Sequence, residues 1–130
     1  MIGQLDAVRS LTPGVGGTAV RNVTSTAAIF ATHFPRFPVL PGVLVIDDLT
    51  RLAALVLAGD GPAERWVPAA VARVRFRHYV RPGDVVELTV QARNDDPSRF
   101  QGSAVVDGTT VTTVGDLTMT RTTAPPGGQG

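Results

Sequence analysis

The chain of 130 residues has no cysteine and no lysine. The absence of cysteine excludes disulfide bonds, thiolate nucleophiles and cysteine-ligated metal sites. All 12 basic residues are arginine and 11 residues are acidic, so the formal net charge of +1 gives no reason to expect a nucleic-acid partner. With two histidines and no carboxylates clustered at ligand spacing, we expect no metal site and no other cofactor.

The sequence also lacks a basic segment followed by a short apolar segment near its start, and no apolar run is long enough to cross a membrane. We therefore expect a cytoplasmic protein. The hydrophobic fraction of 43% and the charged fraction of 18% are typical of a globular chain. We expect one domain over residues 1–123 and a disordered tail, APPGGQG, over residues 124–130.

Candidate chemistry is concentrated in residues 33–48, HFPRFPVLPGVLVIDD. Three prolines within seven residues stiffen the loop that follows His33, because proline fixes its own φ angle and restricts the residue before it. Pro41 suits the first position of a helix, where its missing N–H removes no hydrogen bond. The sequence therefore predicts a helix over residues 41–57, ended by Gly59.

Asp47 lies at the start of the second turn of this helix, among apolar residues. Loss of solvation there would raise the pKa of Asp47 unless a cation compensates. Arg51 is a candidate for that cation, because residues four apart lie on one face of a helix. Asp48 is three residues from Arg51 and could take the arginine instead. The sequence alone leaves open which aspartate pairs with Arg51.

The other segments show the two-residue alternation of strands rather than the period of a helix. A hairpin with the turn PGVGG precedes the helix, and four strands follow a connection over residues 59–66. The expected strands cover residues 4–9, 18–30, 71–80, 86–93, 100–106 and 111–119. One apolar helix and strands joined by short turns predict an α+β fold in which an antiparallel sheet covers the helix.

Two of these strands carry specific expectations about side-chain direction. Over residues 71–80 the even positions form an apolar face, which would make His78 a hydrogen-bonded core or rim residue. The odd positions form either a solvated surface or a docking surface for an acidic carrier protein or for coenzyme A phosphates. They include Arg73, Arg75 and Arg77. One side of the last strand is expected to hold Val111, Thr113, Gly115, Leu117 and Met119.

Two motifs resemble those of bacterial 3-hydroxyacyl-acyl-carrier-protein dehydratases. The first is HFPxxPxxPGVLxxD over residues 33–47, in which an acid follows a histidine by 14 residues. The second is FRxxVxPGD over residues 76–84, and LDAV near the start and a late VDG turn match as well. The resemblance covers most of the chain and implies the hotdog fold, an antiparallel sheet wrapped around one long central helix.

The resemblance also implies roles for individual residues. His33 corresponds to the family's catalytic histidine, Asp47 to its catalytic acid, and Gly42 to a glycine whose amide holds the thioester carbonyl. Further expected substrate contacts are Val43, Phe34 and Arg51. In the family the histidine and the acid of one site come from different subunits, which implies a homodimer with shared active sites, or a larger oligomer built from it.

The chemistry of such a reaction fits these residues. Removing water from a 3-hydroxyacyl thioester needs a base near neutrality for the C2 proton, which His33 can supply. The departing hydroxyl needs a proton, which the carboxyl group of Asp47 can give if apolar surroundings keep it protonated. Amides about Gly42 and Val43 would stabilise negative charge on the thioester oxygen.

The predicted function is therefore the reversible dehydration of 3-hydroxyacyl thioesters in fatty-acid or polyketide-type biosynthesis. The substrate would be carried by acyl carrier protein or coenzyme A. A hotdog acyl-thioester hydrolase is an alternative, although it does not explain His33. A non-catalytic acyl-thioester-binding partner subunit is another, if Arg51 neutralises Asp47. Two departures from the family motif are Arg36, which replaces a glycine, and Arg51, which replaces a glutamine.

Overall fold

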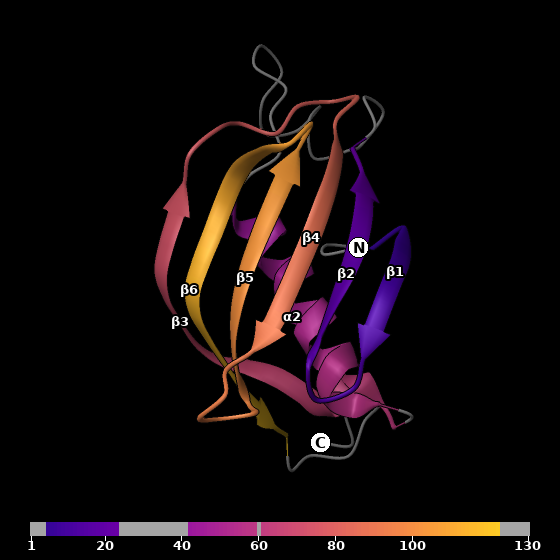
Figure 1. Cartoon of the computed structure of the whole chain (residues 1–130), viewed down its shortest axis with the longest axis vertical. Coiled ribbons are helices and arrows are strands. Elements are labelled where there is room, and N and C mark those ends of the chain that lie inside the picture. The colour runs from indigo at the N-terminus through magenta and orange to yellow at the C-terminus, as the bar shows by residue number, and fades with distance from the viewer. Residues whose placement is uncertain (1–4, 24–41, 60, 123–130) are drawn as a thin grey trace, which may run out of the picture.

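The computed structural model describes residues 5–23, 42–59 and 61–122. These residues form a six-stranded antiparallel sheet in the order β1-β2-β4-β5-β6-β3, and one long helix lies against one face of it (Figure 1). The predicted α+β architecture is confirmed. The elements are β1 (Ala7–Thr12), β2 (Gly16–Asn22), α2 (Gly42–Ala58), the short 3-10 helix η1 (Ala63–Arg65), β3 (Trp66–Phe76), β4 (Val85–Ala92), β5 (Arg99–Val106) and β6 (Thr109–Arg121). The predicted tail, residues 124–130, lies outside the described residues.

Helix α2 supplies the centre of the core because most of its circumference is apolar. Leu49 and Leu52 have no exposed surface. The side chain of Leu49 lies against Gly102 of β5, and that of Leu52 lies against Gly17 of β2. These contacts hold α2 in place on the sheet, because burial of a leucine side chain stabilises a fold by about 1.5–3 kcal/mol.

The helix is terminated at Gly59, as predicted. Gly59 has a φ of 57°, the left-handed conformation that glycine adopts without steric cost. Its amide donates a hydrogen bond to the carbonyl oxygen of Leu55 at 3.2 Å. The carbonyl oxygen of Val56 accepts a second one, at 3.1 Å, from the amide of Gly14 in the β1–β2 turn. The N-terminal hairpin is thereby attached to the end of α2.

The first hairpin differs from the prediction in its turn. The sequence predicts Gly16 and Gly17 in the turn, but both belong to β2, which pairs with β4. The backbone of β4 comes so close that a β-carbon on Gly16 would lie 2.6 Å from the carbonyl oxygen of Val90. The prediction is wrong because glycine here marks the close approach of two strands, not a change in chain direction. Residues 24–30 of the expected second strand lie outside the described residues.

Strand β3 begins and ends earlier than predicted, at Trp66–Phe76 rather than residues 71–80. Pro68 has no N–H to donate, and it is tolerated because β3 is an edge strand that pairs only with β6 among the described strands. The predicted apolar face is confirmed only in part, since Val74 packs against the core and Val80 is buried, whereas Ala72 and Phe76 are exposed. His78 lies beyond the strand and is exposed, so it is not a core residue.

Strand β4 and the β5–β6 turn confirm the predictions made for them. Val86, Leu88 and Val90 are between 0 and 1% exposed, and the residues between them point to solvent. Asp107 and Gly108 form the turn with φ angles of 49° and 78°. Positive φ at both positions is the geometry that a two-residue hairpin turn needs, and Asp-Gly is a preferred sequence for it.

Strand β6 contains register irregularities that change the predicted side-chain directions. Val114 and Leu117 are buried against the core, at 2% and 1% exposure. Thr113 and Gly115 were expected on that side but lie on the other one. A β-carbon on Gly115 would lie 2.8 Å from the Cβ atom of Arg73 in β3. Val111, Leu117 and Met119 are buried as predicted. The prediction is wrong for Thr113 and Gly115, because an extra residue in a bulge shifts the two-residue period.

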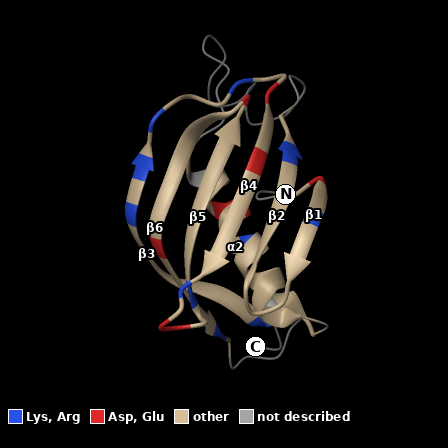
Figure 2. Cartoon of the chain, viewed as in Figure 1, with Lys and Arg blue, Asp and Glu red and all other residues tan. Residues whose placement is uncertain are grey.

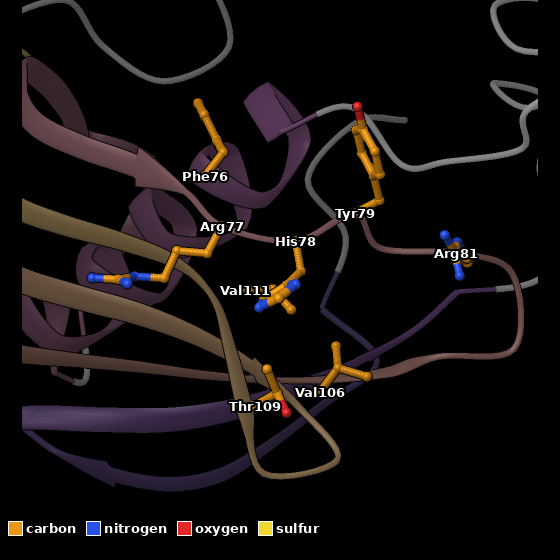
Figure 3. Close-up of a pocket in the computed structure, with 8 residues that line it drawn as sticks. All are labelled: Phe76, Arg77, His78, Tyr79, Arg81, Val106, Thr109 and Val111. Carbon is orange, nitrogen blue, oxygen red and sulfur yellow. The ribbon is translucent and has the colours of Figure 1, made fainter.

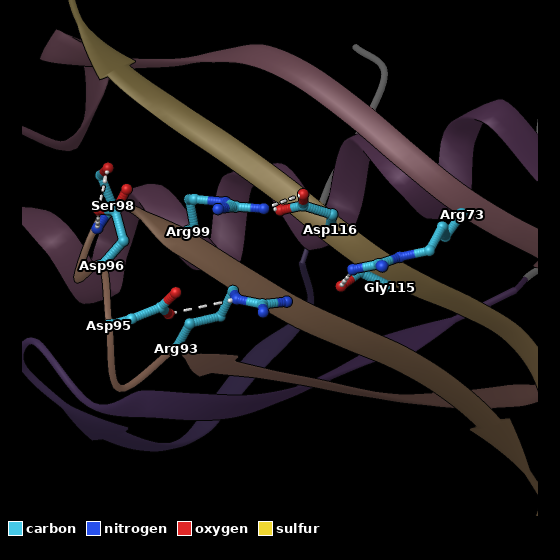
Figure 4. Close-up of polar contacts among 8 residues, drawn as sticks. All are labelled: Arg73, Arg93, Asp95, Asp96, Ser98, Arg99, Gly115 and Asp116. Atoms are coloured by element: carbon cyan, nitrogen blue, oxygen red, sulfur yellow. Dashed lines mark hydrogen bonds and ion pairs between the residues drawn. The ribbon is translucent and has the colours of Figure 1, made fainter.

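The face of the sheet opposite α2 carries charged side chains (Figure 4). Arg99 of β5 and Asp116 of β6 form an ion pair across neighbouring strands, in which Nε of Arg99 donates to Oδ1 of Asp116 at 3.1 Å. Arg73 donates a hydrogen bond to the carbonyl oxygen of Gly115 at 3.4 Å. Ion pairs near the surface contribute little to stability, because water and salt screen them. The stability of the fold therefore comes mainly from the α2 side of the sheet.

We expect Gly16→Ala to lower the free energy of unfolding by about 1–3 kcal/mol, the usual cost of inserting a group where there is no room. The reason is the backbone of Val90, which the new methyl group would meet. Gly102→Ala is a matched control in β5, because its methyl group would lie at ordinary contact distance, 3.4 Å, from Leu49. Urea denaturation measures both variants. Equal stability of the two would contradict the close approach of β2 and β4.

Candidate active site

The first residue of α2 is Gly42, which the sequence predicts to hold a thioester carbonyl. A β-carbon added to Gly42 would lie 2.4 Å from Cε1 of Phe76, the last residue of β3. The phenyl ring therefore lies directly against the start of the helix, and a side chain at this position would displace it. The first amides of a helix have no partner within it, and the positive end of the helix dipole lies beside them. This end of α2 can stabilise negative charge.

Asp47 lies in the second turn of α2 and is partly exposed. Arg51, one turn further along the same side, is exposed. Among the residues that the structure describes, Arg51 forms no ion pair with either Asp47 or Asp48. The ion pair that would neutralise Asp47 is therefore not formed.

Asp48 points into the protein and pairs with Arg21 of β2. Nη1 of Arg21 donates to Oδ1 and Oδ2 of Asp48 at 3.1 and 2.9 Å. The side chains of Arg21 and Asp48 are 14% and 1% exposed, so the pair is largely removed from water. Loss of one partner of a buried ion pair leaves the other charge unpaired at a high energetic cost. This pair joins the second turn of α2 to β2.

The environment of Asp48 changes its acidity. Burial raises the pKa of Asp48 to about 6, because the charged form loses hydration. The hydrogen bonds and the charge of Arg21 act in the opposite direction without cancelling the effect of burial. The negative charge of Asp47 raises the pKa of Asp48 further, and the positive charge of Arg51 lowers it. At neutral pH Asp48 is mostly ionised and paired, and it takes up a proton as the pH falls toward 6.

Sequence reasoning missed the pair of Arg21 and Asp48. It considered only partners of Asp48 on the same helix, whereas Arg21 lies 27 residues away in the chain. One signal was available. Arg21 alternates with Ala19 and Val23, both buried apolar residues, which places an arginine on the core-facing side of β2. A buried arginine needs an acid, and the apolar helix offers two aspartates.

The structure places some of the other predicted site residues and not others. His33 and Phe34 lie outside the described residues, and the side chain of Val43 is not described either. The backbone of Gly42 and Val43 forms the first turn of α2, and Asp47 follows in the next turn. The helix start and the predicted acid are thus carried by one rigid element.

An open pocket of about 690 Å³ lies beside the segment that follows β3 (Figure 3). Phe76 borders it on the side of α2, and Val106 and Val111 make another part of it apolar. Its polar part is formed by Arg77, His78, Tyr79, Arg81 and Thr109. The sequence did not predict this pocket, because the expected strand over residues 71–80 placed His78 on a buried face.

The described residues contain no group of three or more His, Asp or Glu side chains that could hold a metal ion. Within the same part of the chain, no helix is both long enough and apolar enough to span a bilayer.

Comparison with known proteins identifies the family. The sequence model of the ApeI-like family, described as ApeI dehydratase, matches residues 17–113. The chain belongs to the ApeI-like dehydratase family. The 3-hydroxyacyl-acyl-carrier-protein dehydratase FabZ of Pseudothermotoga lettingae is 38% identical over 97 residues, which cover 73% of this dehydratase and 69% of the relative. FabZ of Bordetella pertussis is 33% identical over 114 residues, covering 80% and 76%. The resemblance predicted from the motifs is confirmed, and the protein is a lyase.

Solved structures support the fold of this dehydratase. A chain of the dehydratase heterocomplex ApeI:P from Xenorhabdus doucetiae has a TM-score of 0.73 and 21% identity, covering 93% of this dehydratase and 100% of that chain. An uncharacterized protein from Pyrococcus horikoshii has a TM-score of 0.70 and 12% identity, covering 95% and 85%. At such identities the likeness concerns the fold alone, and it confirms the predicted hotdog fold.

We expect the stability of this dehydratase to depend on pH through Asp48. The folded pKa of about 6 exceeds the ordinary value of 3.8, so the folded state binds more protons than the unfolded state between these values. Stability is therefore lost as the pH rises through this range. The loss should be about 3 kcal/mol, at about 1.4 kcal/mol per pKa unit. Asp48→Asn should remove this dependence, as measured by urea denaturation at a series of pH values.

Asp95→Asn is the control for this experiment, because the side chain of Asp95 is 67% exposed. This variant should follow the pH profile of the unmodified protein. A constant difference in stability between Asp48→Asn and the unmodified protein across the range would rule out a raised pKa for Asp48.

Proposed function

We propose that this protein catalyses the reversible dehydration of 3-hydroxyacyl thioesters to 2-enoyl thioesters, with His33 as the base and Asp47 as the acid. The names of the FabZ relatives support this substrate class. The observation that carries the proposal is the arrangement of two neighbouring aspartates. Asp48 is held inside the protein by Arg21, while Asp47 is partly exposed one turn beyond the helix start and has no ion-pair partner among the described residues.

In the proposed reaction His33 takes the proton from C2 of the substrate, and the electrons of the C–H bond move toward the thioester oxygen before they form the C2=C3 double bond. The C3–O bond breaks, and the hydroxyl group takes the proton of Asp47 and leaves as water. Return of a proton from His33 to Asp47 restores the starting state. Histidine suits the first step because its ordinary pKa lies near neutrality. Only protons are transferred, so the reaction requires no redox cofactor.

The start of α2 would stabilise the charge that develops in this reaction. As C2 loses its proton, negative charge moves to the thioester oxygen, and the amides of Gly42 and Val43 would donate hydrogen bonds to it. Fixed donors of this kind typically contribute about 10²–10³-fold to a rate. Phe76 lies against Gly42 and would give the bound thioester an apolar neighbour.

The two alternative functions have less support. A non-catalytic partner subunit would require Arg51 to neutralise Asp47. This ion pair is not formed in the described part of the chain. A hydrolase would leave His33 without a role. The curated relatives reported above are dehydratases.

The names of the same relatives support a proposal for the carrier of the substrate. Their names specify acyl carrier protein. We propose that this protein also acts on a thioester of an acyl carrier protein or of coenzyme A, in a cytoplasmic fatty-acid or polyketide-type pathway.

We also propose that two copies associate through β3 and share their active sites. Strand β3 pairs with β6 on one side and with no described strand on the other. It exposes three large apolar side chains, those of Val67, Val71 and Phe76. An unpaired edge with apolar side chains favours the addition of another strand. The structural neighbour from Xenorhabdus doucetiae is part of a heterocomplex, which supports assembly by this fold.

We expect His33→Ala and Asp47→Asn each to slow the interconversion of 3-hydroxyacyl and 2-enoyl carrier-protein thioesters by about 10²–10⁴-fold, the usual contribution of an acid or base. Asp48→Asn is the matched control on the same helix and should keep most of the activity, because Asp48 faces Arg21. The assay follows both thioesters and free thiol by mass spectrometry.

Three results would contradict this proposal. Release of thiol without interconversion would identify a hydrolase. Loss of activity in Asp48→Asn but not in Asp47→Asn would show that Asp48, and not Asp47, is the acid. If neither interconversion nor thiol release occurs with any carrier, a non-catalytic partner subunit is the remaining function.

We expect Val71→Asp to convert a dimer into a monomer, because a charge at this position of β3 would be buried without a partner in a paired edge. Val8→Asp is the control, since Val8 is similarly exposed on β1, at the opposite edge of the sheet. Sedimentation velocity gives the mass of each variant. A monomeric unmodified protein, or equal dissociation of both variants, would exclude β3 as the dimer interface.

A further inference from the structure

The ring of Phe76 occupies the space that a side chain at the start of α2 would fill. Three of its carbon atoms, Cε1, Cδ1 and Cζ, would lie 2.4, 2.7 and 2.9 Å from a β-carbon added to Gly42. A phenyl ring is rigid, so it cannot bend out of the way and has to move as a whole. The observed contact between the ring and the first turn of α2 therefore requires glycine at position 42.

The position of Phe76 is not explained by packing of the core. Its side chain is 56% exposed, whereas that of Phe100 in β5 has no exposed surface. An exposed phenyl ring gives up part of the free energy that full burial would provide. The side chain of Phe76 points away from His78 and Val111 (Figure 3). The ring thus lies at the surface of the described structure, beside the helix start.

The backbone around Phe76 is held firmly by β6. Phe76 is paired with Thr112 at the end of β3. The amides of the next two residues, Arg77 and His78, both donate to the carbonyl oxygen of Val111, at 2.7 and 3.4 Å. Val111 and Thr112 are each 2% exposed. The ring therefore projects from a fixed point of the sheet toward a helix that is itself fixed on the sheet.

The neighbours of Phe76 in the sequence are cations, but the side chain beside α2 is apolar. Figure 2 shows arginines along β3 and the segment after it. Arg75 is paired with Thr113 and lies on the other face of the sheet, because successive residues of a strand alternate. Arg77 points in a different direction from Phe76 (Figure 3). The ring brings no charge to the helix start, so its effect there is to displace water.

Displacement of water would strengthen the hydrogen bonds proposed at the helix start. The first amides of a helix have no partner within it, and water competes with a carbonyl oxygen for them. Electrostatic interactions are stronger where the local dielectric constant is low. A ring on one side of Gly42 also limits the directions from which a carbonyl group can approach.

We propose that Phe76 is a positioning residue of the proposed dehydration, whose ring shields the amides of Gly42 and Val43 from water and fixes the side from which the thioester carbonyl reaches them. The inference rests on the proposed function, because it assumes that a thioester lies at the start of α2. Phe76 acts through these amides and takes no part in the transfer of protons.

The first experiment tests the contact without a substrate. Gly42→Ala should lower the midpoint of urea denaturation in the unmodified protein, because its methyl group meets the ring. In a Phe76→Ala background the same change should cause no loss, since the space is then vacant. Val67→Ala is the matched background, because it removes an exposed apolar side chain from the same strand. Equal loss in all three backgrounds would overturn the contact and the proposal with it.

The second experiment measures the hydrogen bonds to the carbonyl group. Butanoyl thioesters of coenzyme A and of acyl carrier protein have no 3-hydroxyl group, so they bind without being dehydrated. Infrared spectroscopy of the isotope-labelled thioester carbonyl should show a lower stretching frequency in the unmodified protein than in water. This decrease should be smaller in Phe76→Ala and unchanged in Val67→Ala. An unchanged frequency with both thioesters in the unmodified protein would overturn the proposal.

Turnover of 3-hydroxyacyl thioesters completes the test. Phe76→Ala should lower kcat about tenfold with a smaller change in KM, less than the loss of a whole donor would cause. Val67→Ala should retain the activity of the unmodified protein. If the unmodified protein shows a Phe76-dependent decrease in frequency but no turnover, the dehydration is refuted and the role of Phe76 at the helix start is retained. Turnover with frequency and kcat unchanged in Phe76→Ala would refute the role of Phe76 and retain the dehydration.

Discussion

Burial of the apolar side of α2 against the sheet is the contact on which the rest of this protein depends. Leu49 and Leu52 have no exposed surface and lie against glycines of β5 and β2. Because a helix is rigid, fixing these two residues also fixes Gly42 at one end of it and Asp47 between. The helix start, where backbone amides can receive negative charge, and the carboxyl group that we propose as the acid are therefore held at a constant separation, roughly 7.5 Å along the helix axis.

The pair of Arg21 and Asp48 shows how the fold treats two adjacent aspartates differently. Successive residues of a helix point about 100° apart, so Asp48 faces β2 when Asp47 does not. Burial without Arg21 would leave Asp48 as an uncompensated charge beside the core, and an apolar residue in its place would leave Arg21 without a partner. Asp48 thereby provides the partner that the largely buried Arg21 needs.

The sequence was sufficient for the parts of the structure that follow local rules. The helix, its end at Gly59, the alternation of β4 and the turn at Asp107 and Gly108 were all predictable from periodicity and glycine position. The errors arose where neighbouring strands decide the outcome. Gly16 pairs with β4 instead of turning the chain, and a bulge of β6 moves Thr113 and Gly115 off the core-facing side. Asp47 is predicted as the acid from its motif, and this stays a prediction. The pair of Arg21 and Asp48 was not predicted, because its members lie 27 residues apart in the chain and only the folded sheet brings them together.

The hairpin turn between β5 and β6 has a consequence for how ligand preference can evolve in this fold. Val106 precedes the turn and Thr109 follows it, and both border the pocket beside β3. One side of that pocket is thus bordered by the two residues that flank a two-residue turn, while Asp48 and its partner Arg21 lie on α2 and β2. Insertions at Asp107 and Gly108 would change what the pocket admits while the groups on α2 stay in place. The pocket and the groups on α2 can therefore change separately.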